Sequence, residues 1–447
     1  MTSMILPKGL ERPAKHPEPT LRGDTVCAER YISEAYLQDE YRKVWHKVWN
    51  IGGLSYQMPE PGDYLTTELG ASSIIMSRQE DGSVKAFHNS CPHRGAMVTD
   101  APDGHTKTFA CPYHGWQFNT EGVVTWVPDQ ENFPQGNPCG KARLKPMQCV
   151  ERFGFIWYNF DDDAPSLEAF LGPQVVLELA SYRCENMVRA LNITAEAECN
   201  WKIITDNFNE SYHVQVLHHG LLPYITASYK EAQLDLFPGG HNRGWFPSFL
   251  PSPGYGDEKG DGRLGEPMKS MAAEWGIDSD NYVGREAWKQ LRVDVQQAKL
   301  AQGVDKGFAH YAHLTDFQTT DYAIYNVFPN NVLTGAPDGM QLLRPRPHPT
   351  DPNKCLFDHW WLVHPIAGRD MTPSPAGGPD LPVEDAEHEL IKYGEKTLGT
   401  TADEDLSIAA IQQRGLKSAG YQGYYMADQE RRVQHFHEVL NDYMSKD

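Results

Sequence analysis

The sequence lacks the features of membrane, secreted and nucleic-acid-binding proteins. No apolar run approaches the roughly 20 residues needed to cross a bilayer, and the first twenty residues contain no apolar core of a signal peptide. Basic residues are in deficit, with 40 Lys and Arg against 60 Asp and Glu and a net charge of −20. Because such a surface repels nucleic acid and anionic membranes, we expect a cytoplasmic protein that binds neither.

Cysteine is scarce, and most of it follows no spacing pattern. Six of the eight cysteines are expected to be free thiols in a reducing compartment: Cys27, Cys139, Cys149, Cys184, Cys199 and Cys355. The other two, Cys91 and Cys111, each stand in a short motif. With 447 residues, 11 tryptophans and 21 tyrosines, the chain is long enough for two or three domains with well-filled cores.

The two motifs each combine one thiol with one imidazole. Cys91-x-His93 is followed, after 17 intervening residues, by Cys111-x-x-His114. A zinc finger usually pairs its cysteines on one loop and its histidines on another, whereas here each loop supplies one of each. A Rieske [2Fe-2S] centre needs two Cys on one iron and two His on the other. The pattern therefore predicts such a centre, with a structural zinc site as the alternative.

Short strands surround these motifs. A helix is expected over residues 33–50, ended by Gly52 and Gly53, because apolar residues recur at helical spacing. The strands that we expect next are 64–66, 73–76, 84–87, 108–110, 117–119 and a closing strand over 150–159. They suggest a small antiparallel barrel that holds the two motif loops at its tip.

A second concentration of polar residues lies in the segment 200–219. Its apolar residues alternate with Asp206, Asn207, Asn209, Glu210, His213 and His218. Burying so many polar side chains without partners would cost several kcal/mol, so they require a metal or a hydrogen-bond network. Ferrous iron accepts two His and one carboxylate and keeps open positions for dioxygen. A helix that loosens after His213 would bring His213 and His218 to one ion; the alternative is that both are surface or capping residues.

The sequence resembles the catalytic α subunit of the Rieske non-heme iron oxygenases, the aromatic-ring-hydroxylating dioxygenase family, from about Trp49 to the C-terminus. Many relatives have Asp where this chain has Glu210, and His219 is the alternative to His218. The family's motif positions fall on the cluster ligands Cys91, His93, Cys111 and His114 and on the iron-site residues Glu210, His213 and His218.

The resemblance also implies a third iron ligand, an Asp on a downstream helix. The segment T-A-D-E-D-L-S-I-A-A-I-Q-Q-R-G-L is similar to that helix. Asp405 is the position carried over, with Asp403 and Glu404 as alternatives. The implied cofactors are thus one [2Fe-2S] Rieske cluster and one mononuclear Fe(II).

The resemblance implies an α+β fold with two domains. These are a small antiparallel β Rieske domain and a helix-grip (START-like) catalytic domain, in which a curved antiparallel sheet folds over a long helix. We expect an N-terminal arm and helix packing on the catalytic domain over residues 1–48, the Rieske domain over 49–162 and the catalytic domain over 163–447. Residues 326–333 and 355–363 are typical of its strands, and 428–443 of a helix.

The implied assembly is a head-to-tail homotrimer, with or without a small β subunit. In the family the cluster of one subunit faces the iron of its neighbour, so His114 would meet Glu210 across the interface and Glu210 would hydrogen-bond His213. A ferredoxin or flavin reductase would deliver electrons from NAD(P)H, and the subunit would use O2 to oxidise a small organic molecule.

The substrate is less defined by the sequence. Hydroxylation of an aromatic or related cyclic compound is the leading expectation. Oxidation of a quaternary ammonium or N-methyl/O-methyl compound is the competitor, because the segments I-Q-Q-R-G-L-K-S-A-G-Y and R-V-Q-H-F-H resemble that branch. Pocket residues are expected from Phe208, from 235–250 and from the strand near Phe328. The sequence does not distinguish one inserted oxygen atom from two.

Overall fold

A computed structural model describes residues 13–253, 262–374 and 379–446. The chain divides into two compact units. One unit is Gln38–Phe170, and the other is Leu171–Lys446 together with the described residues that precede Gln38. Among these described residues, none of the helices combines the length and the apolar composition needed to span a membrane.

The smaller unit is built from antiparallel strands. Its main sheet has the order β1-β10-β9-β4-β3-β2-β5, and a second sheet has the order β6-β7-β8. Their bounds are β1 (Asn50–Leu54), β2 (Asp63–Leu69), β3 (Ser72–Arg78), β4 (Val84–His88), β5 (Asp103–His105), β6 (Thr108–Ala110), β7 (Gln117–Asn119), β8 (Val124–Trp126), β9 (Pro146–Arg152) and β10 (Phe155–Asn159). The strands predicted before and after each motif are confirmed.

The predicted closing strand over 150–159 is wrong, because the chain turns in its middle. Phe153 and Gly154 both have positive φ, 56° and 78°, and β9 and β10 pair on either side of them, with Phe155 opposite Arg152. Two consecutive residues with positive φ make the tight hairpin turn that matches strand twist. A bulky residue such as Phe153 rarely adopts a positive φ. The sequence pattern therefore predicted one continuous strand across this turn.

The helix predicted over residues 33–50 is shorter. α1 (Glu29–Ile32) and α2 (Glu34–Lys43) are followed by a single 3₁₀ turn, and Gly52 and Gly53 lie inside strand β1 rather than ending a helix. A Cβ atom on Gly52 would stand 2.3 Å from the Met76 sulfur. The absence of side chains at these two glycines therefore allows neighbouring side chains to pack closely against β1.

The larger unit contains an eight-stranded sheet with the order β12-β13-β14-β15-β16-β17-β11-β20. Every pairing is antiparallel except β11 with β20. The strands are β11 (Val188–Ala197), β12 (Gln233–Leu236), β13 (Asn242–Phe246), β14 (Tyr322–Val327), β15 (Asn331–Ala336), β16 (Gly339–Pro347), β17 (Cys355–Val363) and β20 (Glu389–Lys392). β18 (Met371–Thr372) and β19 (Leu381–Pro382) form a separate small pair. The predicted strand over 355–363 is confirmed.

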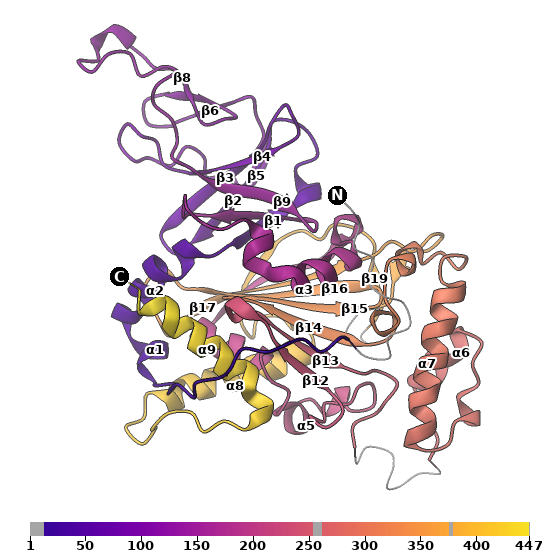
Figure 1. The fold of residues 1–447 in the computed structure, drawn as a ribbon. Coiled ribbons are helices and arrows are strands. Elements are labelled where there is room, and N and C mark those ends of the chain that lie inside the picture. Colours follow the sequence, from indigo (N-terminus) through magenta and orange to yellow (C-terminus); the bar gives the residue numbers. More distant parts are fainter. Residues whose placement is uncertain (1–12, 254–261, 375–378, 447) are drawn as a thin grey trace. The chain divides into compact units, whose positions relative to one another are not determined.

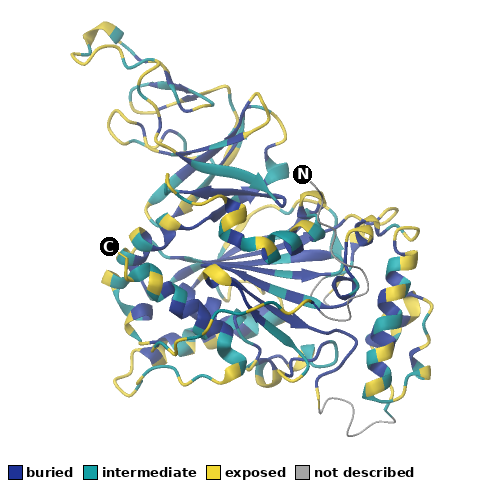
Figure 2. Ribbon diagram, viewed as in Figure 1, coloured by how far each residue is buried: buried dark blue, intermediate teal, exposed yellow. Residues whose placement is uncertain are grey.

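Helices pack on this sheet or stand beside it. They are α3 (Leu167–Tyr182), α4 (Trp201–Phe208), α5 (Val214–Leu217), α6 (Met268–Glu274), α7 (Arg285–Gln302), α8 (Thr400–Leu416) and α9 (Arg431–Met444). α4 lies against β16 and β17, α8 lies against α4, and α9 contacts β12 (Figure 1). The strands are largely buried, whereas α7 alternates between buried and exposed residues (Figure 2). The core therefore lies between the sheet and these helices, and the predicted C-terminal helix is confirmed as α9.

The strand predicted over 326–333 is in fact two strands. β14 ends at Val327, β15 begins at Asn331, and Pro329 lies in the turn between them. Proline has no N–H to donate to a ladder, so a central strand cannot continue through it. The ring of Phe328 packs on Phe436 and Tyr443, with centroid distances of 5.6 and 5.3 Å.

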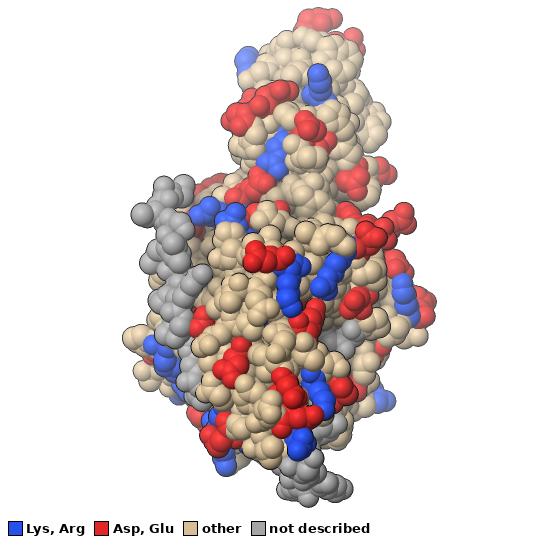
Figure 3. Space-filling model, turned by 90° about the vertical axis from the view of Figure 1, so that its right-hand side faces the viewer, with Lys and Arg blue, Asp and Glu red and all other residues tan. Residues whose placement is uncertain are grey.

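Acidic and basic side chains are interspersed on the face drawn in Figure 3. Lys47 and Asp161, 3.0 Å apart, form one surface ion pair of the smaller unit, and Arg22 and Asp442, also 3.0 Å apart, form one of the larger. On that face charges of both signs are therefore mixed rather than gathered in one acidic field.

Candidate metal centres and substrate cavity

The two motif loops of the smaller unit have the same backbone hydrogen bonds. In the first, the N–H of Cys91 donates to the carbonyl of Ala96 at 2.8 Å, and the N–H of Gly95 donates to the carbonyl of Cys91 at 2.9 Å. The second loop repeats both bonds at the same spacing, from Cys111 to Trp116 and from Gly115 to Cys111. Gly95 and Gly115 have positive φ, 79° and 71°, which L side chains rarely adopt. Two equivalent loops thus present equivalent side chains.

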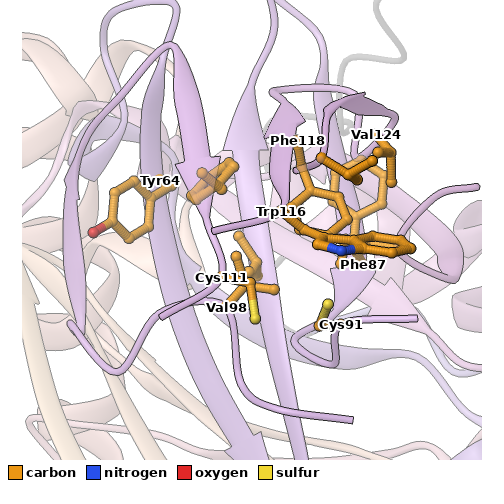
Figure 4. Packing of buried hydrophobic residues seen from close by; sticks show 12 residues of the cluster. Tyr64, Phe87, Cys91, Val98, Cys111, Trp116, Phe118 and Val124 are labelled. Atoms are coloured by element: carbon orange, nitrogen blue, oxygen red, sulfur yellow. The ribbon is translucent and has the colours of Figure 1, made fainter. Parts of the chain in front are cut away.

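The four predicted cluster ligands meet at the end of one hydrophobic cluster. Cys91 and Cys111 are 3% and 2% exposed and belong to the cluster that also contains Trp116 (Figure 4). The rings of His93 and His114 lie 4.6 Å apart, and His93 stacks on Trp116 at 4.9 Å. Burial, together with the adjacent Cys111 thiol, raises the pKa of Cys91. The thiols are therefore inside, whereas His93 is exposed and His114 is half-buried.

This donor set fits a Rieske cluster. Two buried thiols and two imidazoles on paired loops match the ligands that such a cluster requires. The Nδ1 atom of His114 is also buried without a hydrogen-bond partner among the described residues. A buried polar atom without a partner carries an energetic cost, which ligation by a metal would remove.

In the larger unit, the predicted iron-site helix breaks earlier than expected. α4 ends at Phe208, and α5 begins only after His213, so the loosened segment precedes His213 rather than following it. Asn209 caps the end of α4, and its side-chain oxygen accepts a hydrogen bond from Asn242 Nδ2 at 2.7 Å. This contact fixes the end of α4 against β13. His218 then ends the single turn of α5.

Three predicted iron ligands converge. Nε2 of His213 and Nε2 of His218 are 3.1 Å apart, and Oδ1 of Asp405 lies 2.9 Å from His218 Nε2 and 3.5 Å from His213 Nε2. The ligand atoms of the three residues all lie within 4.8 Å of one another.

Both oxygens of Asp405 are buried, and neither has a hydrogen-bond partner among the described residues apart from these close imidazole nitrogens. Two imidazoles and one carboxylate form the facial ligand set of non-heme Fe(II). Burial lowers the pKa of His218, but Asp405 and Glu404 outweigh burial and raise it. The two carboxylates therefore favour a cation at this point, and the residues fit an iron ion.

A carboxylate also contacts the outer nitrogen of each imidazole. Nδ1 of His213 lies 2.5 Å from Glu210 Oε1, and Nδ1 of His218 lies 2.6 Å from Glu404 Oε2. Carboxylates in this position fix the tautomer and orientation of metal-binding histidines. The sequence indicated Glu210 as a partner of His213, but it suggested Glu404 only as an alternative ligand.

The other alternative iron ligands, Asp403 and His219, do not join the three convergent residues. Asp403 accepts hydrogen bonds from the Thr397 hydroxyl at 2.5 Å and from the Leu398 N–H at 3.1 Å. His219 is exposed. Of the three acidic neighbours, Asp405 is therefore the residue whose carboxylate lies beside both Nε2 atoms.

A cavity of about 130 Å³ adjoins the three convergent residues. Its lining is predominantly apolar, and among the described residues it contains neither Lys nor Arg. It consists of Asn207, Phe208, Glu210, Ser211, His213, Val214, His218, Leu221, Tyr224, Ile225, Ala227, Phe246, Tyr322, Ile324, Thr334, Gln341, Leu343, Trp361, Thr401, Ala402 and Asp405. Phe208 and one residue of 235–250 line it as expected. The strand near Phe328 also contributes as expected, through Tyr322 and Ile324 of β14. Phe328 itself does not line the cavity, since it packs on α9.

The sequence did not indicate the part of the sheet-side wall that β16 and β17 supply. Gln341 and Leu343 come from β16, and Trp361 comes from β17. The strand over 355–363 was predicted, and alternation along it places every second residue on one face. Which face meets the cavity depends on the pairing of strands distant in sequence.

A Rieske-type domain and a domain with a non-heme iron ligand set define the class of Rieske oxygenases. Residues 48–146 match the family described as Rieske [2Fe-2S] domain. Residues 184–446, more than half of the chain, match the ring hydroxylating alpha subunit (catalytic domain). The chain belongs to this ring-hydroxylating α-subunit family.

Curated relatives carry names of aromatic dioxygenases. The chain is 31% identical over 240 residues to the chlorobenzene dioxygenase subunit alpha of Cupriavidus sp. (strain PS12), covering 48% of this chain and 51% of the relative. It is 35% identical over 191 residues to the large oxygenase component of the naphthalene 1,2-dioxygenase system of Pseudomonas fluorescens, covering 41% and 42%. The matched region thus spans about half the length of these relatives.

Solved structures share the fold over almost the whole chain. A naphthalene 1,2-dioxygenase from Rhodococcus sp. bound to indole has a TM-score of 0.63 at 18% identity and covers 94% of each chain. A quaternary ammonium Rieske monooxygenase in complex with L-carnitine has a TM-score of 0.61 at 18% identity, covering 94% of this chain and 96% of that one. Both likenesses concern the fold alone.

Proposed function

We propose that this chain is the oxygenase component of a multicomponent system that uses O2 to hydroxylate a small aromatic compound. The observation that carries the proposal is the apolar cavity of about 130 Å³ beside His213, His218 and Asp405. An ion at these residues would therefore face any molecule in the cavity. The aromatic dioxygenase relatives support the same substrate class.

The size of the cavity favours a single ring. An apolar cavity of about 150 Å³ binds one benzene molecule, and the cavity here is about 130 Å³. The proposed substrate is therefore monocyclic.

In this proposal the chain's residues bind the metal, orient the substrate and exclude water. A ferrous ion supplies a redox centre with open coordination positions for dioxygen. Glu210 and Glu404 hold the two imidazoles so that both Nε2 atoms face the same point. Apolar side chains such as Ile225 and Phe246 position an apolar ring and keep the site dry.

The proposal includes an electron donor and an oligomer. A ferredoxin or flavin reductase supplies electrons to the Rieske domain, for which Cys91, His93, Cys111 and His114 are the proposed ligands. A head-to-tail homotrimer, in which His114 of one copy meets Glu210 of the next, connects the two kinds of site. The six cysteines outside the motifs are unpaired, which supports the cytoplasm as the compartment.

Oxidation of a quaternary ammonium or N-methyl compound is the second candidate. Aromatic side chains attract such cations through their ring faces, and Tyr224, Tyr322 and Trp361 all line the cavity. The relatives and the small apolar volume favour the aromatic ring instead.

A single-turnover experiment distinguishes the two candidates. The iron-loaded protein is chemically reduced without oxygen, mixed with a monocyclic arene or with a small quaternary amine, and exposed to ¹⁸O2. Isotope label in a ring hydroxyl group supports the proposal, and the number of labelled atoms distinguishes mono- from dioxygenation. Demethylation of the amine with an unchanged arene would assign the second candidate, and the absence of product from either compound would contradict both.

A further inference from the structure

A row of four side chains crosses the sheet-side wall of the cavity. In the strand register Ile324 pairs with Thr334, Thr334 with Gln341, and Gln341 with Trp361. Directly paired residues of neighbouring strands project from the same face, and all four line the cavity. Gln341 is the long polar side chain in this row.

Gln341 is fixed by a residue of the next strand. Its amide Nε2 donates a hydrogen bond to Nε2 of His359 at 2.8 Å. His359 is 2% exposed, and burial lowers its pKa to about 4. The ring is therefore neutral near pH 7, and because the amide nitrogen of Gln341 can only donate, Nε2 of His359 is the acceptor of this bond.

The rest of the Gln341 amide remains available to a bound molecule. Its contact with His359 is the one hydrogen bond that this amide makes among the described residues. An amide has one oxygen and two N–H groups, so one oxygen and one N–H are left over. A hydroxyl group, which both donates and accepts, matches this pair.

The charges of the cavity lining restrict which polar group of a bound molecule can contact Gln341. The carboxylates of the lining, Glu210 and Asp405, belong to the metal-binding side, and none of the described lining residues is Lys or Arg. A carboxylate substituent at Gln341 would therefore meet no basic side chain of the described lining, and burying it without such a partner is costly. The neutral Gln341 amide suits an uncharged polar group.

We propose that Gln341, held by His359, selects monocyclic aromatic compounds that carry one uncharged hydrogen-bonding substituent, such as a hydroxyl group. This specificity rests on the proposed function, because the same cavity must hold the ring beside the metal-binding residues. The two ideas are nevertheless separable, since selectivity of binding requires neither electrons nor oxygen.

Calorimetric titration of the iron-loaded protein, without oxygen or reductant, tests this selectivity. Phenol, toluene and benzoate serve as probes of similar size that differ in polarity and charge. In Gln341→Met, which keeps the length of the side chain but removes the amide, the ratio of phenol to toluene affinity should fall about tenfold, as expected for one lost neutral hydrogen bond. Benzoate should bind more weakly than phenol.

Leu343→Met is the matched control. Leu343 lies two residues along the same strand and lines the same cavity, so this substitution alters the apolar lining without removing a polar group. The phenol to toluene ratio should be unchanged in this variant. Retained toluene binding in Gln341→Met would show that its cavity is intact.

The role of His359 is tested by a pair of variants. His359→Leu removes the partner of Gln341 and should lower the phenol to toluene ratio while toluene binding persists. His359→Gln, which can still bond to the amide, should restore the ratio.

Three outcomes would overturn the inference: an equal ratio of phenol to toluene affinity in wild type and Gln341→Met, tighter binding of benzoate than of phenol, or no binding of any probe. If the ratios change as expected but the single-turnover experiment yields no ring product, the proposed function fails and the selectivity stands.

Discussion

Glu404 and Asp405, adjacent on α8, contact different nitrogens of the same histidine. Glu404 lies 2.6 Å from Nδ1 of His218, and Asp405 lies 2.9 Å from its Nε2. Nδ1 of His213 is contacted in the same way by Glu210. Each imidazole is thus oriented from its outer side while its inner nitrogen faces Asp405, so the ring geometry is set before a metal binds.

The first prediction concerns Glu404 as a positioning residue. Glu404→Ala should weaken Fe(II) binding at the mononuclear site by about 10–100-fold, the usual cost of losing such an outer partner, because His218 is no longer held. Competition with a chromophoric chelator measures the affinity. Asp403→Ala is the control: Asp403 bonds to Thr397 and Leu398 rather than to a metal-site histidine. Equal iron affinity in Glu404→Ala and wild type would show that Glu404 does not position the ring.

The second prediction distinguishes the acidic neighbours as ligands. Asp405→Ala should lose the mononuclear iron while cluster iron and acid-labile sulfide remain, because the convergent carboxylate is removed and the Rieske motifs are unchanged. Metal and sulfide analysis of purified protein measures both. Retention of mononuclear iron in Asp405→Ala, with its loss in Asp403→Ala, would reverse the assignment.

The third prediction concerns Glu210. In the proposed trimer Glu210 links His213 to His114 of another copy, so Glu210→Gln should keep both metal centres but lower turnover by about 10–100-fold, the range typical of such partners. Oxygen uptake coupled to substrate oxidation gives the rate, and the spectrum of the reduced cluster gives its integrity. A near-normal rate would exclude the bridging role.

The fourth prediction is a pH dependence of stability. Burial lowers the pKa of His359 from 6.5 to about 4, so between these values the unfolded chain binds a proton that the folded chain does not. The free energy of unfolding should therefore fall as the pH drops from about 6.5 to 4, by at most about 3 kcal/mol from this residue. Urea unfolding at a series of pH values measures it.

His359→Gln removes this titration and should flatten part of the pH dependence. Part of the pH dependence that remains in this variant comes from His364, because burial also lowers the pKa of His364, to about 3. An identical slope in the variant and in wild type would show that His359 titrates normally in the folded protein.

The features that the sequence predicted well are local ones. Cys111-x-x-His114 lies on the short loop between the paired strands β6 and β7, and Cys91-x-His93 lies in a turn closed by the hydrogen bond from Gly95 N–H to the Cys91 carbonyl. Spacing alone therefore brings each thiol near its imidazole. The strand over 355–363 and the C-terminal helix also follow from simple periodicity.

The features that could not be predicted from the sequence depend on side-chain direction and on strand register. Neighbouring residues on a helix point about 100° apart, so spacing could not tell that Glu404 contacts Nδ1 and Asp405 contacts Nε2 of His218. The Gln341–His359 contact joins residues on two strands and depends on their exact register. The turn at Phe153 required a positive φ at a residue that rarely adopts one. No sequence pattern encodes these relations.

The most direct test of the account asks whether iron and substrate share the space beside His213, His218 and Asp405. Nitric oxide, added to the anaerobically reduced protein in place of dioxygen, gives an EPR signal at a mononuclear ferrous site. We predict a ferrous-nitrosyl signal in addition to the signal of the reduced cluster, and a shift of the nitrosyl signal when phenol enters the cavity. A reduced-cluster signal without any nitrosyl species, in protein replete with iron, would contradict the account.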